Sequence, residues 1–320
     1  MTQLKEINSR NFVLNEKVIN GTTACFPGKP FMQALKMLKT TSEIYGQISS
    51  AHVQLCPQTV SRVSIKCVDQ LMKEFAHTQL RLHANVKRSD AVELFDCSRD
   101  IKSRDSVQWQ SYIKDIKEVN DYLGRPDYSI HAGRQSVALP KMYDNLRKIQ
   151  DYMKCRVAVE GLYPSGRTPW NLSTFEQYEQ LLKQDVFFAL DLSHVHIMYK
   201  QDKNKDISQW RELIKSLLEH KNCIEVHLSD NNGLEDIHRP LKAETWWWSV
   251  FVEAKLAPGC TIFTEGNQLR STLPTLERLP TPSAHRIRHP SVESGNGNST
   301  GNSTGNSTGK SDRENKPYIQ

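Results

Sequence analysis

The residues of this sequence that could do chemistry are histidines and carboxylates that directly follow short apolar runs. Two of the runs end in LHAN and IHAG, and two others end in VAVE and TIFTE. The runs FFALD and EVH supply further candidates in and just after them. Together these six runs deliver nine side chains that can bind a metal or move a proton: His83, His131, Glu160, Asp191, His194, His227, Asp236, His238 and Glu265.

This combination of residue types indicates metal chemistry. A carboxylate at the end of an apolar run is costly to bury unless a cation lies close to it. Lysine and arginine are scarce beside these positions. Metal ions would supply the missing positive charge, and neutral imidazoles with carboxylates suit zinc, manganese or iron. One such residue alone is more often structural, but nine after six successive runs favour a shared site.

The elements that must position these residues alternate along the chain. Eight apolar runs are predicted to be strands, at residues 18–24, 51–56, 80–85, 128–132, 156–160, 186–190, 223–228 and 261–265. Seven amphipathic stretches with helical spacing lie between them, at 30–46, 68–79, 106–124, 139–153, 174–184, 206–220 and 244–255. The alternation predicts an α/β fold of the (β/α)8 TIM-barrel type, in which the carboxyl ends of all strands converge on one mouth.

Composition and motifs exclude several other classes. The chain has 320 residues, of which 38% are hydrophobic and 24% charged, as expected for a globular protein. No apolar run of about 18 residues occurs, and the N-terminus is charged from Lys5 onward. We therefore expect no membrane span and no secretory signal, and a cytoplasmic location. The seven cysteines never form a CxxC pair, so we expect reduced thiols.

The charge is weak on the predicted barrel, and the end of the chain changes character. The net charge of +6 divides evenly, with +3 in residues 268–320 and +3 in the rest, which does not by itself indicate nucleic-acid binding. The repeat GNSTGNSTGNSTG has almost no apolar side chains that could offset the entropy of ordering it. We therefore expect a TIM-barrel domain over residues 1–279 and a disordered tail over 280–320.

The motifs LHAN, IHAG, VEG, LDLSH, VHLSD, DIH and TEG, in this order, resemble the xylose isomerase-like TIM barrels. Within that superfamily the sequence is most similar to the endonuclease IV branch, whose members hold three zinc ions with nine side chains. The resemblance implies a first metal on His83, His131 and Glu160. A second would use Glu160, Asp191, His227 and Glu265, and a third His194, Asp236 and His238. It thus implies two or three divalent ions per chain, with zinc expected and iron or manganese as alternatives.

The same resemblance implies a multinuclear metal-dependent hydrolase of phosphoesters, of the AP endonuclease type. Its substrate would be a small-molecule or nucleic-acid phosphoester. Glu160 would bridge two metals, and Glu265 would orient or deprotonate the attacking water. Three arginines on loops near the strand ends are candidates for clamping an anionic substrate: Arg134, Arg167 and Arg239.

Two other enzyme classes remain as alternatives. Sugar-phosphate isomerases and epimerases of the same superfamily use a single metal, which here would lie on Glu160, Asp191, His227 and Glu265. In such an enzyme Glu160 and Glu265 would move a proton next to a carbonyl. Multi-iron TIM-barrel oxidases, which modify a peptide cysteine together with a partner protein, resemble the closing segment DIHRPLKAETWWWSVFVEAKLAPGCTIFTEG.

Deleting residues 281–320 should leave folding and metal content unchanged, because the GNST tract offers almost no side chains to a core. Thermal unfolding and elemental analysis of the deleted and full-length chains would measure this. A large drop in the melting temperature of the deleted chain would contradict the prediction.

Overall fold

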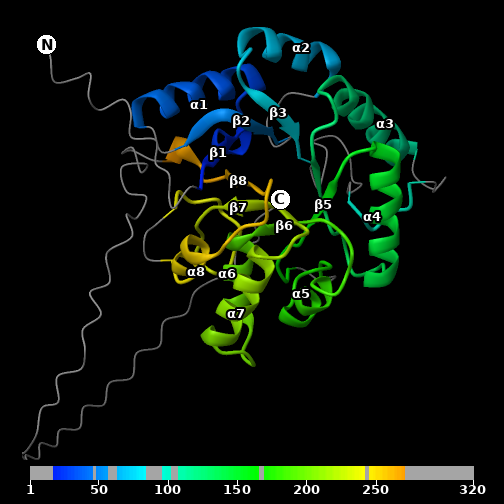
Figure 1. The fold of residues 1–320 in the computed structure, drawn as a ribbon, viewed down its shortest axis with the longest axis vertical. Helices are drawn as coiled ribbons and strands as arrows, with labels where there is room; N and C mark the ends of the chain where they lie inside the picture. The colour runs from blue at the N-terminus through cyan, green and yellow to red at the C-terminus, as the bar shows by residue number, and fades with distance from the viewer. Residues whose placement is uncertain are drawn as a thin grey trace, which may run out of the picture. The chain divides into compact units, whose positions relative to one another are not determined.

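The computed structural model describes residues 17–45, 48–56, 63–83, 96–101, 107–165, 169–241 and 245–270. Strands and helices alternate along the chain (Figure 1). The strands are β1 (Ile19–Thr22), β2 (Ser49–Leu55), β3 (Gln79–Leu82), β4 (Tyr128–His131), β5 (Val157–Glu160), β6 (Phe188–Asp191), β7 (Cys223–Leu228) and β8 (Thr261–Thr264). The helices are α1 (Phe31–Tyr45), α2 (Ile65–Glu74), α3 (Val107–Tyr122), α4 (Leu139–Met153), α5 (Phe175–Leu181), α6 (Leu192–Gln201), α7 (Ile207–Leu218) and α8 (Trp248–Glu253), with 3₁₀ turns η2 (Thr23–Cys25) and η3 (Gln268–Arg270).

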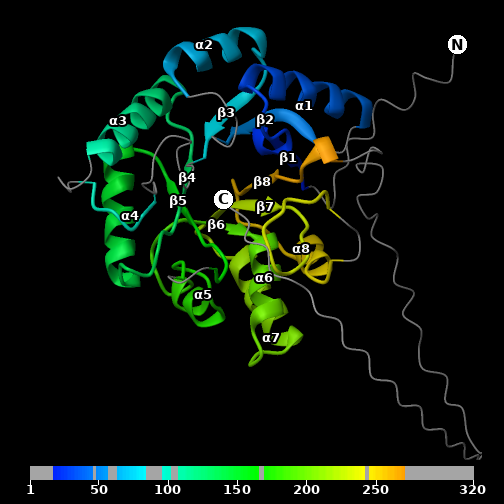
Figure 2. The ribbon, with the colours of Figure 1, turned by 180° about the vertical axis from the view of Figure 1, so that it is seen from behind.

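The eight strands form one parallel sheet that curves into a nearly closed barrel. Their order is β3-β2-β1-β8-β7-β6-β5-β4, so β3 and β4 stand at its two ends. A parallel bridge between His83 and Ser129 links these two ends. Figures 1 and 2, from opposite sides, show the helices arranged around the strands. The predicted (β/α)8 TIM barrel is therefore confirmed.

All eight predicted strands are present, each end within a few residues of its predicted place. Positions 84 and 85 of the third prediction lie outside the described residues. One helix, α6, is not among the predicted stretches. It follows β6 directly with no glycine or proline between them, so the run FFALDLSHVHI does not mark where the strand ends and the helix begins. In the structure the side chain of Asp191 accepts hydrogen bonds from the backbone N–H groups of Ser193 and His194, at 2.6 and 3.1 Å. This N-cap ends β6 and begins α6, so His194 lies in a helix rather than on a strand.

The helices cover the barrel through apolar stripes with helical spacing. α4 buries Met142, Leu146, Ile149 and Met153, and α7 buries Trp210, Ile214 and Leu217. The carboxyl ends of the strands together form what we call the barrel mouth.

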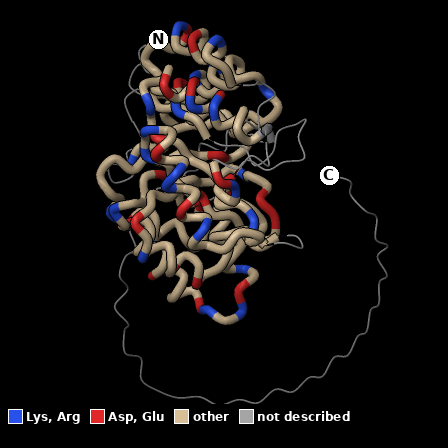
Figure 3. The backbone as a smooth tube through the Cα atoms, turned by 90° about the vertical axis from the view of Figure 1, so that its right-hand side faces the viewer, with Lys and Arg blue, Asp and Glu red and all other residues tan. Residues whose placement is uncertain are grey.

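Three further features bear on the expectations from the sequence. None of the helices in the described part of the chain is both long and apolar enough to span a bilayer. All seven cysteines are described and none is in a disulfide. Lysine and arginine are interspersed with aspartate and glutamate along the tube in Figure 3. The expected disordered tail over 280–320 lies outside the described residues.

Replacing Gly161 by alanine should destabilise the fold at the end of β5. A Cβ atom at this position would overlap the carbonyl oxygen of Leu172 and the hydroxyl of Tyr178. Because one of these atoms belongs to the backbone, we expect the free energy of unfolding to fall by about 1–3 kcal/mol. Urea unfolding of Gly161→Ala beside the parent would measure this, and an unchanged midpoint and slope would contradict it.

Candidate metal centre

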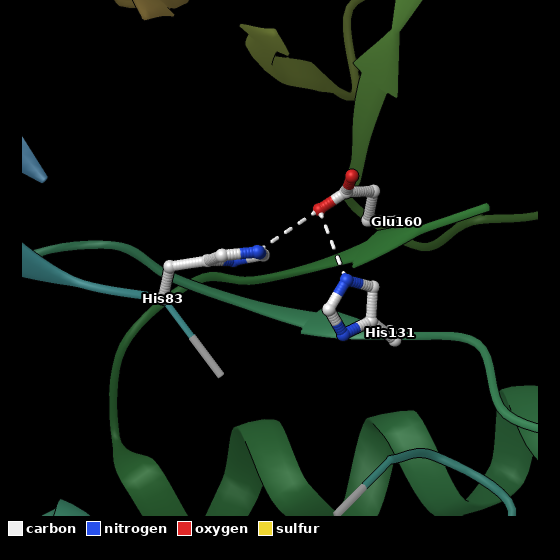
Figure 4. A group of neighbouring side chains, drawn as sticks. All are labelled: His83, His131 and Glu160. Atoms are coloured by element: carbon white, nitrogen blue, oxygen red, sulfur yellow. Dashed lines mark ion pairs between the residues drawn. The ribbon is translucent and has the colours of Figure 1, made fainter. Parts of the chain in front are cut away.

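Glu160, the last residue of β5, lies at the centre of the barrel mouth and is buried. Its Oε2 lies 3.3 Å from Nε2 of His83 and 3.9 Å from Nε2 of His131. Figure 4 shows both imidazoles pointing toward this oxygen. Its Oε1 lies 3.4 Å from Nδ1 of His227 and 3.7 Å from Nδ1 of His194. The two oxygens of one carboxylate thus face two different pairs of imidazoles.

Strand register brings these residues together from distant parts of the sequence. β4 and β5 pair so that His131 lies beside Glu160. β6 and β7 pair so that Asp191 lies beside His227. Alternation along each strand then directs these side chains to the inner face of the barrel. The mouth is therefore built by parallel pairing, as the sequence predicts.

Two overlapping groups around Glu160 could each hold a metal ion. Ligand atoms of His83, His131 and Glu160 all lie within 4.8 Å of one another, and so do those of Glu160, Asp191 and His227. Glu265, directly after β8, adds an oxygen 3.9 Å from Nδ1 of His227. These two groups contain residues that the sequence resemblance assigns to the first and second metals, and Glu160 belongs to both groups.

A third group surrounds Asp236 on the loop after β7. Its Oδ2 lies 3.2 Å from Nε2 of His194 and 2.7 Å from Nε2 of His238. His238 adopts a left-handed backbone conformation, with φ of 45°. Such a conformation is costly for a residue other than glycine and persists only where the surroundings impose it. Here it accompanies an imidazole that contacts Asp236 and lies 3.6 Å from Oε2 of Glu265.

The electrostatics of the mouth follow from burial and from this crowding. Burial alone would raise the pKa of Glu160, but the imidazoles of His227 and His83 hold it well below its usual range. Burial would lower the pKa of His194, but Asp191 and Asp236 raise it well above the usual value.

The pKa values of the other ionisable groups in the mouth follow from the same two effects, burial and neighbouring charges. Burial would lower the pKa of His227, but Glu160 and Glu265 raise it well above its usual value. Burial would also lower the pKa of His238, but Asp236 raises it to about 9. Burial lowers the pKa of His131 to about 3 and raises that of Glu265. In the metal-free chain, protons on the imidazoles therefore supply part of the positive charge that the carboxylates need.

These donor atoms fit a divalent cation. Among the described residues, six buried side-chain atoms of the nine candidate ligands have no hydrogen-bond partner: Nδ1 of His131, His227 and His238, Oε2 of Glu160, Oδ2 of Asp191 and Oδ1 of Asp236. Buried polar atoms are normally satisfied, so orphans that face one another in a mouth need an explanation. Imidazole nitrogens and carboxylate oxygens are ligands for zinc, iron and manganese. Buried histidine and carboxylate groups that could bind a metal are thus present.

The three arginines predicted to bind substrate have different surroundings. The guanidinium of Arg134 stacks on Trp170, 3.6 Å from the ring centroid, and donates to the carbonyl of Ser165. Arg239 is exposed, and its backbone pairs with that of Asp230. Arg167 lies outside the described residues. Their role in substrate binding stays a prediction.

Sequence reasoning missed a polar network just below the site. Arg81 forms a buried ion pair with Glu225, and Glu225 also lies 2.5 Å from Nε2 of His227. Burial would raise the pKa of Glu225, but Arg81 and His227 lower it to about 2. The signal was present, because each charged residue stands two positions before a candidate ligand inside a predicted strand.

Comparison with known proteins gives matches of structure only. Neither a protein-family model nor a curated protein matches the sequence. A D-tagatose 3-epimerase-like protein is 14% identical and has a TM-score of 0.50, covering 78% of this chain and 91% of its own. The 3-keto-D-glucoside 4-epimerase of E. coli is 13% identical, with a TM-score of 0.50 and coverage of 82% and 96%. A putative xylose isomerase from Rhodospirillum rubrum is 11% identical, with a TM-score of 0.52 and coverage of 78% and 90%.

At these identities the comparisons show the fold. The chain is similar to xylose isomerase-like TIM-barrel proteins, which confirms the fold that the strand-end motifs implied.

Metal binding should strengthen as pH rises from 6 to 8. In the metal-free chain the pKa of His238 is about 9, and those of His194 and His227 are raised, so these imidazoles hold protons that a metal ion must displace. Each displaced proton should change the apparent affinity about tenfold per pH unit. Chelator competition at several pH values would measure the affinity, and calorimetry in two buffers would count the protons. An affinity independent of pH in this range would contradict the prediction.

Proposed function

We propose that this chain is a metal-dependent enzyme that hydrolyses phosphoesters at a multinuclear centre in the barrel mouth. The observation that carries the proposal is the position of Glu160: its Oε2 faces His83 and His131 at 3.3 and 3.9 Å, and its Oε1 faces His227 at 3.4 Å. A site for one metal would need imidazoles at only one of these oxygens. A carboxylate with proposed ligands at both oxygens would be suited to two ions, as in two-metal phosphoester chemistry.

The proposed ligands form three sets. His83, His131 and Glu160 would hold a first ion, Glu160, Asp191, His227 and Glu265 a second, and His194, Asp236 and His238 a third. Zinc is the expected metal, with iron and manganese as alternatives. Divalent ions bound in this way neutralise charge on phosphate oxygens and lower the pKa of water toward neutrality.

The chain's own residues would complete the chemistry. Glu265 is buried at the mouth, with its two oxygens 3.9 Å from His227 and 3.6 Å from His238. Burial raises its pKa, which suits a carboxylate that accepts and holds a proton from the attacking water. Arg134 and Arg239, with Arg167, are proposed to contact the substrate anion.

The substrate is proposed to be a phosphoester, either a small molecule or nucleic acid of the AP endonuclease type. Charges of both signs are interspersed over the described chain (Figure 3). Because phosphate contacts by clustered cations dominate duplex affinity, this mixture favours recognition of one phosphoester group over a long duplex.

A sugar-phosphate isomerase or epimerase is the second candidate, and two observations favour it. Two of the proteins of the same fold are a D-tagatose 3-epimerase-like protein and a 3-keto-D-glucoside 4-epimerase. Glu160 and Glu265 also flank His227, at 3.4 and 3.9 Å, as two carboxylates that move a proton would. In such an enzyme His83, His131, Asp236 and His238 would have no ligand role.

Loading the protein with zinc should give two or three ions per chain and metal-dependent cleavage of a phosphoester. Glu160→Gln should lower the occupancy of two sites together and reduce cleavage about 100-fold or more, because it removes a bridging negative charge. Elemental analysis gives the stoichiometry, and assays with an abasic-site duplex and a chromogenic phosphodiester give the activity. Glu212→Gln on the exposed face of α7 is the matched control and should change neither.

The other assignments predict different results in the same assays. One ion per chain, with turnover of a ketose and no phosphoester cleavage, would favour the isomerase. Bound iron with a visible absorption band, and turnover of a cysteine-containing peptide together with a partner protein, would favour the oxidase.

A further inference from the structure

A buried ion pair lies directly below the proposed metal centre. Arg81 of β3 and Glu225 of β7 contact each other with their side chains 1% and 0% exposed. Each precedes a proposed ligand by two residues, His83 on β3 and His227 on β7. Because side chains alternate along a strand, each charged residue shares the inner face with the ligand that follows it.

The barrel interior has room for this pair. Two residues before Glu160 and Asp191 stand Ala158 and Ala189, which are fully buried. Bulky branched residues usually fill the interior layers of a TIM barrel. Replacing a buried ion pair by well-packed apolar residues is often neutral or stabilising, so stability alone is a weak reason for Arg81 and Glu225. Their contacts with the ligands point to a further role.

Glu225 determines how the imidazole of His227 is presented. Its Oε1 lies 2.5 Å from Nε2 of His227 and also accepts a hydrogen bond from Gln54 at 2.6 Å. An ionised carboxylate only accepts hydrogen bonds, so Nε2 carries a hydrogen. The other nitrogen, Nδ1, faces Glu160 and Glu265. A nitrogen that binds metal must carry no proton, and this arrangement keeps Nδ1 as the one that faces the mouth.

The hydrogen bonds around Glu225 also reach a second proposed ligand, His83. Gln54 also donates to the hydroxyl of Ser129, at 3.1 Å. That hydroxyl lies 2.8 Å from Nδ1 of His83, whose Nε2 faces Glu160. One network thus contacts the inner nitrogens of both His83 and His227.

We infer that Glu225 and Arg81 are positioning residues for the proposed metal centre: Glu225 fixes the orientation and tautomer of His227, and Arg81 fixes Glu225. The inference rests on the proposed metal centre, and it concerns residues that would touch neither metal nor substrate. Replacing a residue that hydrogen-bonds to a metal ligand typically lowers metal affinity by about 10–100-fold.

Glu225→Gln tests the inference, because a carboxamide has nearly the same shape but can donate as well as accept. We expect zinc affinity, measured by chelator competition, to fall about 10–100-fold. Long-range ¹H–¹⁵N NMR spectra of the zinc-loaded protein should show His227 protonated on Nε2 alone in the parent, and a mixture of Nε2- and Nδ1-protonated rings in the variant. Circular dichroism would establish that the variant is folded.

Asp127→Asn is the matched control. It removes one partner of another ion pair, between Asp127 and Arg156, with contacts of 2.6 and 2.8 Å. These residues precede β4 and β5, at the end of the barrel opposite the mouth. Asp127→Asn should lower the free energy of unfolding without changing zinc affinity. Replacing a positioning residue such as Glu225 should lower the zinc affinity itself.

The outcomes separate this inference from the proposed function. A parent protein that binds no metal would overturn the proposed function, and the inference with it. A parent that binds zinc, with Glu225→Gln binding as tightly, would overturn the inference alone. If Glu225→Gln does not fold because Arg81 is left without its partner, the double variant Arg81→Met, Glu225→Gln removes both charges. The double variant should bind zinc more weakly than the parent, and equal affinity would overturn the inference.

Discussion

Buried negative charge inside the barrel is the constraint on which the rest of the structure depends. Four carboxylates lie there with little or no exposure to solvent: Glu160, Asp191, Glu225 and Glu265. Glu225 has an arginine, whereas Glu160 faces imidazoles on both oxygens. An imidazole beside a carboxylate supplies positive charge when it is protonated, and it becomes a fellow ligand when a metal displaces the proton. The charge balance of the mouth therefore depends on whether protons or metal ions occupy it.

Backbone groups at the strand ends also hold the buried carboxylates and imidazoles of the mouth in place. One oxygen of Asp191 caps α6, while the other has no hydrogen-bond partner among the described residues and lies 3.6 Å from His194. The backbone carbonyl of Gly161 accepts a hydrogen bond from Nδ1 of His194. A side chain at position 161 would not fit. Asp191 and Gly161 thus both shape the backbone after their strands and position proposed ligand atoms. A substitution that shifts the backbone there would therefore also shift the ligands.

The sequence allowed the fold and the candidate site to be predicted for one physical reason. Parallel strands in a barrel end at one mouth, so listing the polar residue after each apolar run also lists the side chains that meet there. Interactions across the barrel are not visible in a local pattern. Arg81 and Glu225 are 144 positions apart, and only the closure of the sheet brings β3 and β7 to face each other. The helix α6 was not predicted because it follows β6 with no turn residue between them, and only the capping by Asp191 in the folded chain separates the two elements.

The choice between one metal and several depends on residues that a single tetrad does not explain. His83 and His131 are buried with their Nε2 atoms toward Oε2 of Glu160, whereas His227 faces Oε1 of the same carboxylate. His238 holds an unfavourable backbone conformation, which places its imidazole between Asp236 and Glu265. Burying imidazoles and straining a backbone both cost free energy, and a single metal on Glu160, Asp191, His227 and Glu265 would bind none of these three histidines. A multinuclear site would account for both features through ligation, and this is the physical argument behind the proposed hydrolase.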